Sequence, residues 1–145
     1  MSQPPPTKSG TPPASEPALS EVARELVLPE GIVTTAWPSV RDRLRTFGIR
    51  FQRWQDGAGR CILAKRSDGL YAAGIGGAFL AVPRQAGKTF LIGWIAFALC
   101  LIHPGLVVLW TAHRKTTSKE TFRDMADIAR GAHVKPYIAE RGIQT

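Results

Sequence analysis

The feature that most constrains this chain is an alternation of apolar segments in its second half. A short apolar run at 78–82 precedes a longer apolar segment at 88–102, and a second short run fills most of 106–111. Short continuous apolar runs are typical of buried parallel strands, whereas the longer segment has the length of a helix. Pro104 and Gly105 separate this helix from the second run. The order strand, helix, strand predicts a βαβ unit with two parallel strands.

The turn between the first predicted strand and the helix carries the clearest chemical motif, Pro-Arg-Gln-Ala-Gly-Lys-Thr. A glycine there lets the backbone approach a ligand, and the N–H groups of a helix N-terminus favour phosphate. In the pattern Gly-x-x-x-x-Gly-Lys-[Ser/Thr], the lysine reaches the β and γ phosphates and the hydroxyl binds Mg²⁺. Val82 stands where that pattern has its first glycine, and a glycine-capped helix start without a ligand is the alternative interpretation. The predicted phosphate-binding residues are Pro83, Arg84, Gln85, Ala86, Gly87, Lys88 and Thr89.

The charge of the chain indicates a polyanionic partner. Its 145 residues hold 19 Lys and Arg against 11 Asp and Glu, a net charge of +8. Between residues 41 and 66 the excess is strongest, and this stretch is interpreted either as a nucleic-acid patch or as a solvated face. The two cysteines, Cys61 and Cys100, form no Cys-x-x-Cys pair. A disulfide framework and a zinc ribbon are therefore not expected.

The N-terminal part of the chain divides into an arm and a series of short helices. Residues 1–18 hold six of the eleven prolines, which predicts a disordered arm. The remainder, 19–145, is predicted to be one folded unit. Helical periodicity and capping residues predict further helices at 19–30, 38–47, 53–66 and 118–130.

Three stretches of this sequence resemble a known family. Val-Pro-Arg-Gln-Ala-Gly-Lys-Thr, at 82–89, resembles the variant Walker A motif of bacteriophage terminase large subunits, the DNA-packaging motors. Trp54-Gln55, about thirty residues earlier, is similar to the aromatic-Gln adenine motif that the family often carries. Thr111-Ala112-His113 looks like the segment that follows the family's second strand. The resemblance extends over roughly residues 50–130.

The resemblance implies a partial RecA-like P-loop NTPase fold that binds ATP and Mg²⁺. Lys88 and Thr89 would hold phosphate and Mg²⁺, and Arg84 would act as an arginine finger during hydrolysis. Gln55 would hydrogen-bond the adenine edge, with Trp54 packed beside it. The implied partners are double-stranded DNA, a terminase small subunit and a portal protein, with homo-oligomers only in the full-length motor. The implied location is the bacterial host cytoplasm during phage assembly, without a membrane.

The acidic site of such an ATPase is not evident in the sequence. Phosphoryl transfer requires a buried strand that ends in a carboxylate for Mg²⁺ and the attacking water. After Thr89 the acids are Glu120, Asp124, Asp127 and Glu140, and none follows an apolar strand. We therefore expect the N-terminal part of an ATPase domain that lacks the Walker B region and the nuclease domain and is inactive alone.

Two alternative functions remain open at this level. The first is a basic nucleic-acid-binding module without ATPase activity, which would use residues 41–66. The second is a small membrane protein with a span at 90–110, because that stretch carries no charged residue. Against the second stands the Pro104-Gly105 interruption within the stretch.

Overall fold

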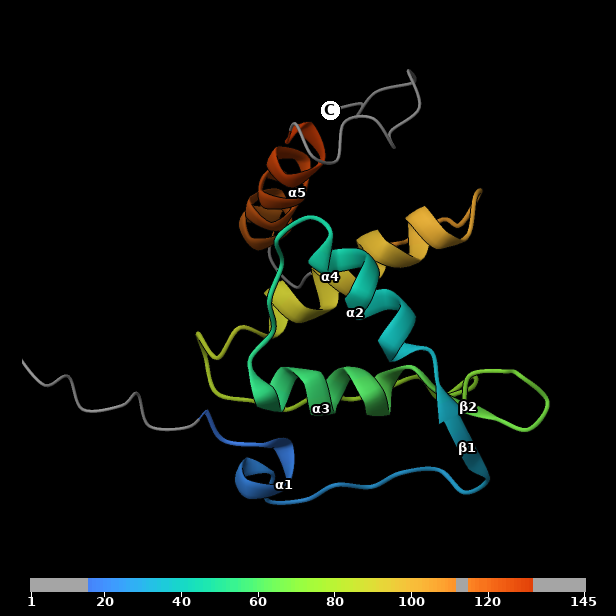
Figure 1. The fold of residues 1–145 in the computed structure, drawn as a ribbon. Coiled ribbons are helices and arrows are strands. Elements are labelled where there is room, and N and C mark those ends of the chain that lie inside the picture. The colour runs from blue at the N-terminus through green and yellow to red at the C-terminus, as the bar shows by residue number, and fades with distance from the viewer. Residues whose placement is uncertain (1–15, 112–114, 132–145) are drawn as a thin grey trace, which may run out of the picture.

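The computed structural model describes residues 16–111 and 115–131 of the protein (Figure 1). Within these residues the chain is mostly helical, with one pair of short strands. Figure 1 shows α3 lying between α1 and the pair formed by α2 and α4. The elements, in chain order, are α1 (Leu19–Val22), β1 (Ile32–Thr35), α2 (Trp37–Arg45), α3 (Arg53–Ile62), β2 (Ala64–Arg66), α4 (Lys88–Ile102) and α5 (Lys115–Arg130).

The two strands form a small antiparallel sheet at one end of α3. Thr35 pairs with Ala64 and Ile32 pairs with Arg66, with an irregularity between Ile32 and Thr34. This pairing ends the third predicted helix early, because the chain after Ile62 turns to pair with β1. The sheet thus fixes the ends of α2 and α3 next to each other.

The predicted α/β fold, a partial RecA-like domain with a parallel sheet, is wrong. Neither 78–82 nor 106–111 forms a strand, and the sheet of the described residues is antiparallel and lies elsewhere. Phe79 is 94% exposed and Val107 is 87% exposed. An apolar run becomes a parallel strand only where a neighbouring strand bonds its backbone and both of its faces are covered. Here helices, and not a sheet, cover the apolar segment between these two runs.

Helix α4 has the bounds that its apolar sequence predicts, Lys88–Ile102. Its buried residues include Leu91, Trp94 and Ala98, which belong to one hydrophobic core with α2 and α3. Each buried aliphatic or aromatic side chain of this kind stabilises the fold by about 1.5–3 kcal/mol. The core residues are Trp37, Val40, Leu44, Trp54, Ala58, Leu63, Leu91, Trp94, Ile95 and Ala98.

The close packing of α2 on α3 depends on a glycine. Trp37, at the start of α2, has no exposed surface, and its ring lies directly over Gly59 of α3. A Cβ atom at Gly59 would lie 2.5 Å from Cε3 of Trp37. Glycine lowers helix propensity, and here that cost is offset by the burial of the largest side-chain type.

The ends of the described chain bear on two of the predictions. The predicted disordered arm, 1–18, lies outside the described residues except for its last three. There Arg53 donates a hydrogen bond to the carbonyl oxygen of Glu16 at 2.9 Å. The first predicted helix is shorter than expected, since α1 spans only Leu19–Val22.

Across the described residues, no helix combines the length and the apolar character needed to cross a membrane, and α4 stops at Ile102.

Candidate phosphate-binding loop and arginine groove

The 83–89 loop leads directly into α4 and has an unusual backbone. The N–H of Ala86 donates to the carbonyl oxygen of Pro83 at 3.4 Å, which closes a turn. Gln85 has a φ of 63° and Gly87 a φ of 89°, so left-handed residues flank Ala86. Alternation of this kind turns successive N–H groups toward one side and forms an anion-binding concavity. A non-glycine residue held at positive φ stores about 1 kcal/mol or more of strain, as is common in ligand-binding turns.

The charged and hydroxyl groups of the loop point to solvent. Arg84, Lys88 and Thr89 are all exposed. Among the described residues none forms an ion pair with Arg84 or Lys88. Gly87 is the N-cap of α4 and supplies no side-chain cap, and the first N–H groups of a helix have no partner within it. Positive charge, backbone donors and a hydroxyl are thus gathered at one helix end.

Gln55 joins the N-terminal end of α3 to this loop. Its Nε2 donates to the carbonyl oxygen of Gly87 at 3.2 Å, and its Oε1 accepts from the N–H of Gln52 at 2.9 Å. The residue is only 4% exposed. The structure therefore brings Gln55 and Gly87 together across 32 positions of sequence. The adenine contact that the resemblance implies would use the second N–H of Nε2 and the second lone pair of Oε1.

Trp54, the residue before Gln55 on α3, belongs to the hydrophobic core. Its Nε1 donates to Oε1 of Gln52 at 2.8 Å, which holds the ring against the helix N-terminus. Gln52 is thus the N-cap residue that both Trp54 and Gln55 contact. A shallow pocket lies beside the loop, and Trp54 is not among the residues that line it.

A shallow pocket of about 250 Å³ lies beside the loop. It is lined by Gln55, Gln85, Ala86 and Gly87, which the sequence predicted as site residues. Three other residues line the pocket and had no individual role in the sequence analysis, although two of them fall in the basic stretch 41–66. These are Arg50, Gln52 and Phe90.

The chemistry of these groups fits a phosphate-bearing ligand. The φ of 89° at Gly87 favours glycine, and a Cβ there would lie 2.8 Å from Nε2 of Gln55, so the Gln55 side chain would have to shift. Thr89 is exposed, and its hydroxyl would be free to hold nucleotide-bound Mg²⁺ as the sequence motif implies. In residues 16–111 and 115–131, no group of three or more His, Cys, Asp and Glu is placed to hold a metal ion by itself.

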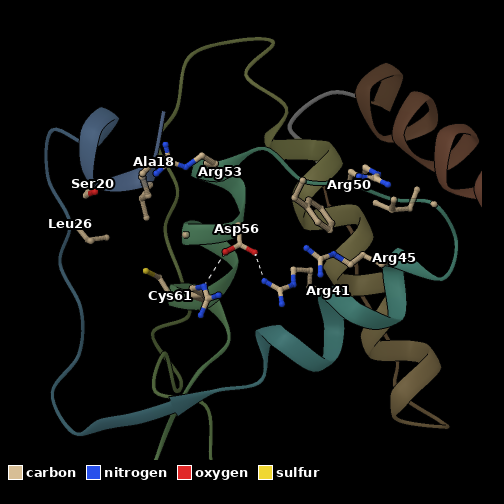
Figure 2. Close-up of a pocket in the computed structure, with 15 residues that line it drawn as sticks. Ala18, Ser20, Leu26, Arg41, Arg45, Arg50, Arg53, Asp56 and Cys61 are labelled. Carbon is tan, nitrogen blue, oxygen red and sulfur yellow. Dashed lines mark hydrogen bonds and ion pairs between the residues drawn. The ribbon is translucent and has the colours of Figure 1, made fainter. Parts of the chain in front are cut away.

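A second and larger concavity also borders α3, and Figure 2 shows it in close-up. Its volume is about 1020 Å³, and residues 18–26, α2, α3 and the segment between α2 and α3 form its walls. Asp56 is the single carboxylate among its lining residues. We call this concavity the arginine groove after the five arginines that line it, Arg41, Arg45, Arg50, Arg53 and Arg60.

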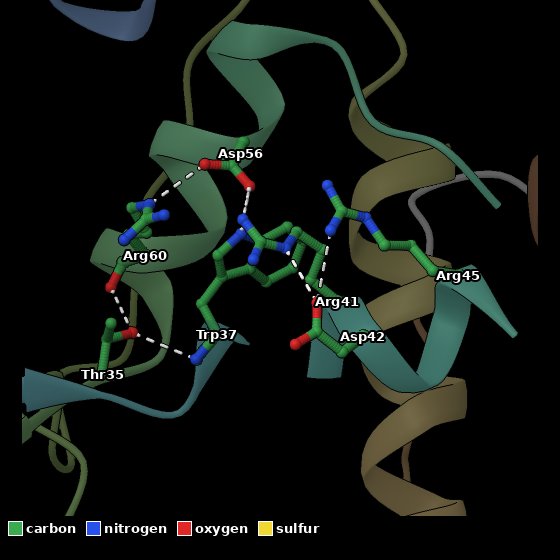
Figure 3. Close-up of polar contacts among 7 residues, drawn as sticks. All are labelled: Thr35, Trp37, Arg41, Asp42, Arg45, Asp56 and Arg60. Atoms are coloured by element: carbon green, nitrogen blue, oxygen red, sulfur yellow. Dashed lines mark hydrogen bonds and ion pairs between the residues drawn. The ribbon is translucent and has the colours of Figure 1, made fainter. Parts of the chain in front are cut away.

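Asp56 lies at the centre of a hydrogen-bond network within the groove (Figure 3). Its Oδ1 accepts from Nε1 of Trp37 at 2.7 Å and from Arg41 at 3.2 Å, and its Oδ2 accepts from Arg60 at 3.0 Å. Partial burial acts to raise the pKa of Asp56, but the hydrogen bonds from Trp37, Arg60 and Arg41 outweigh it. The pKa of this carboxyl is therefore lowered from its ordinary value of 3.8. Asp56 thus stays charged at neutral pH and holds two of the five arginines.

The remaining residues singled out in the sequence either lie outside the described residues or are absent from the lining of the pocket beside the loop. His113, in the segment that resembles the one after the family's second strand, lies outside the described residues. Glu120, Asp124 and Asp127 are exposed on α5, and none of them lines the pocket beside the loop.

Comparison with protein-family models, with curated proteins and with solved structures produced no match to this chain.

Proposed function

We propose that the 83–89 loop binds the phosphates of ATP with Mg²⁺, in a protein related to the terminase large subunits that package phage DNA. The observation that carries this proposal is the left-handed Gly87 at the start of α4, fixed by Gln55 and followed by exposed Lys88 and Thr89. Both the backbone geometry and the residue types favour phosphate. The proposal concerns this loop, its helix and α3, and it does not require a parallel sheet.

Each residue of the loop has a defined role in this proposal. The ammonium group of Lys88 neutralises the β and γ phosphates, and the hydroxyl of Thr89 binds the Mg²⁺ that accompanies them. Arg84, exposed in the turn, adds a second positive charge near the terminal phosphate. Gln55 holds the carbonyl of Gly87, so that the N–H groups that follow face the ligand. ATP supplies the phosphoryl group whose transfer drives a packaging motor.

The remaining parts of the proposal come from the sequence resemblance. They are double-stranded DNA, a small subunit and a portal protein as partners, self-association in the full-length motor, and action in the cytoplasm of the bacterial host. The match of Val82–Thr89 and of Trp54-Gln55 to the family's motifs supports them.

Isothermal titration calorimetry with Mg-ATP tests the proposal. Lys88→Ala is expected to weaken binding about 10- to 100-fold, because a hydrogen bond to a charged group contributes about 1.5–3 kcal/mol. Lys119→Ala removes an exposed lysine from α5 and is the matched control, with no expected change. Equal affinity in wild type and Lys88→Ala would refute phosphate binding at this loop. Circular dichroism of each variant establishes that the fold is intact.

A further inference from the structure

We propose that the arginine groove binds the phosphodiester backbone of a nucleic-acid strand, independently of base sequence. The groove is distinct from the 83–89 loop, and Arg50 is the charged residue that lines both concavities. Five arginines and one aspartate line it, which gives a net charge of +4. The proposal does not depend on ATP binding, because the strand is expected to bind without nucleotide.

Two of the arginines are held by Asp56, and the other three are exposed, although Arg53 also donates one hydrogen bond to the carbonyl oxygen of Glu16. Arg41 and Arg60 bond to Asp56, which fixes their guanidinium groups within the groove. Arg45, Arg50 and Arg53 are exposed. Arg45 pairs at 3.5 Å with the exposed Asp42, and exposed pairs of this kind contribute little. Figure 2 shows Arg41 and Arg45 extending from α2 toward Asp56, with Arg53 at the far end beside Ala18.

The length of the groove favours a polymer over a single phosphate. Arg53 and Arg60 are seven positions apart on α3, which corresponds to about 10 Å of helix at about 1.5 Å per residue. Each strand of a B-form duplex rises about 3.4 Å per nucleotide along the helix axis, so about three nucleotides of a duplex strand span this distance. One phosphate group cannot contact both ends. Arginine also matches phosphate better than lysine does, because its planar guanidinium donates two parallel hydrogen bonds.

The walls of the groove add an apolar component. Ile49 and Phe51 line it between α2 and α3, and Leu26 lines it from the N-terminal side. Aromatic and apolar side chains beside a row of cations are a common arrangement for binding nucleic acid without sequence preference, because every base has a face that can stack. This composition favours a nucleic-acid strand over an acidic peptide.

Fluorescence anisotropy with a labelled 20-nucleotide strand of mixed sequence, and with its duplex, tests the proposal. The full chain is titrated between 50 and 200 mM salt in the absence of nucleotide. Arg45→Gln/Arg53→Gln is expected to weaken binding at least tenfold, about one log unit, at 100 mM salt. The slope of log affinity against log salt is expected to fall by about 2 for this double variant.

Two matched variants distinguish binding in the groove from a general effect of positive charge on the protein surface. Arg66→Gln/Arg123→Gln removes two exposed arginines that do not line the groove, and its affinity should stay within about twofold of wild type. Arg45→Lys/Arg53→Lys retains the charge and should retain the salt slope. Equal losses in the two glutamine variants, or no binding by wild type at 50 mM salt, would overturn the proposal. Displacement of the strand by millimolar Mg-ATP, with a parallel loss of ATP affinity in Arg45→Gln/Arg53→Gln, would instead assign the groove to nucleotides and overturn it as well.

Discussion

The Nε2 of Gln55, on α3, donates a hydrogen bond to the carbonyl oxygen of Gly87 at the start of α4, 3.2 Å away. The same carbonyl accepts the first hydrogen bond of α4, from the N–H of Leu91. One side chain thus connects the N-terminal ends of two helices and fixes the residue that precedes Lys88. This contact is the structural basis on which the proposed phosphate site rests.

Replacement of Gln55 should destabilise the protein and disorder the loop. In Gln55→Ala the N–H of Gln52 and the carbonyl of Gly87 lose a buried partner, which costs about 1–3 kcal/mol. Gln55→Glu retains the acceptor for Gln52, but it loses the donor to Gly87 and places a nearly buried carboxylate against that carbonyl oxygen, so it should destabilise the protein at least as much as Gln55→Ala. Urea unfolding measures both effects. A loss below about 0.5 kcal/mol in both variants would show that the contact does not support the fold.

Gly87→Ala should be more harmful than a substitution at a second left-handed glycine. Gly87 and Gly105 have φ values of 89° and 85°, so alanine is strained at both, by about 1–2 kcal/mol. Only at Gly87 would the added Cβ also meet Nε2 of Gln55, at 2.8 Å. We expect Gly87→Ala to lower the free energy of unfolding more than Gly105→Ala, and to weaken Mg-ATP binding where Gly105→Ala does not. Equal effects on binding would argue against a ligand at the loop.

Gly59→Ala should destabilise the packing of α2 on α3. The new methyl group would overlap the ring of Trp37, and overpacking of this kind costs about 1–3 kcal/mol. Gly93→Ala is the matched control within α4, because its Cβ would lie 3.4 Å from the flexible end of Met125. There the higher helix propensity of alanine should leave stability unchanged or raise it by up to about 1 kcal/mol. Thermal unfolding of the two variants measures the difference, and equal melting temperatures would contradict the packing described here.

Asp56 should make stability dependent on pH in the acidic range. Partial burial opposes its ionisation, but hydrogen bonds from Trp37, Arg60 and Arg41 lower its pKa below 3.8 in the folded state. A carboxyl with a lowered folded pKa stabilises the protein above its unfolded pKa, and this contribution is lost as pH falls through the folded pKa. The free energy of unfolding should therefore fall below about pH 4 in wild type and fall less in Asp56→Asn. Urea unfolding at pH 7 and at pH 3 measures this, and identical pH dependence in the two proteins would exclude Asp56 as the cause.

Helices were predicted from the sequence more accurately than strands. The bounds of α4 follow from its apolar length and from Gly87 and Pro104 at its ends, both local signals. Val40 and Leu44 are buried on α2, as their helical spacing predicts. The strands predicted at 78–82 and 106–111 are wrong, because an apolar run does not specify which segment will pair with it. Nor does sequence periodicity predict β1 and β2, whose pairing joins residues about thirty positions apart.

The candidate site was predicted in part. The position of Gly87, Lys88 and Thr89 at a helix N-terminus is confirmed by the bounds of α4. The proximity of Gln55 to this loop followed from resemblance to a family motif, and the structure shows it as a contact with the backbone of Gly87. Sequence alone could not predict that Arg50 lines both concavities, because its position depends on the path of the chain between α2 and α3.

Amide chemical shifts in ¹⁵N-labelled protein, followed as Mg-ATP is added, test phosphate binding at the 83–89 loop most directly. Phosphate binding at the loop should give saturable shifts at the N–H groups of Gly87, Lys88 and Thr89, with a smaller shift at the side-chain amide of Gln55. Lys88→Ala should remove these shifts at the same ATP concentrations. Absence of any shift at these amides, or shifts confined to residues of the arginine groove, would contradict the account.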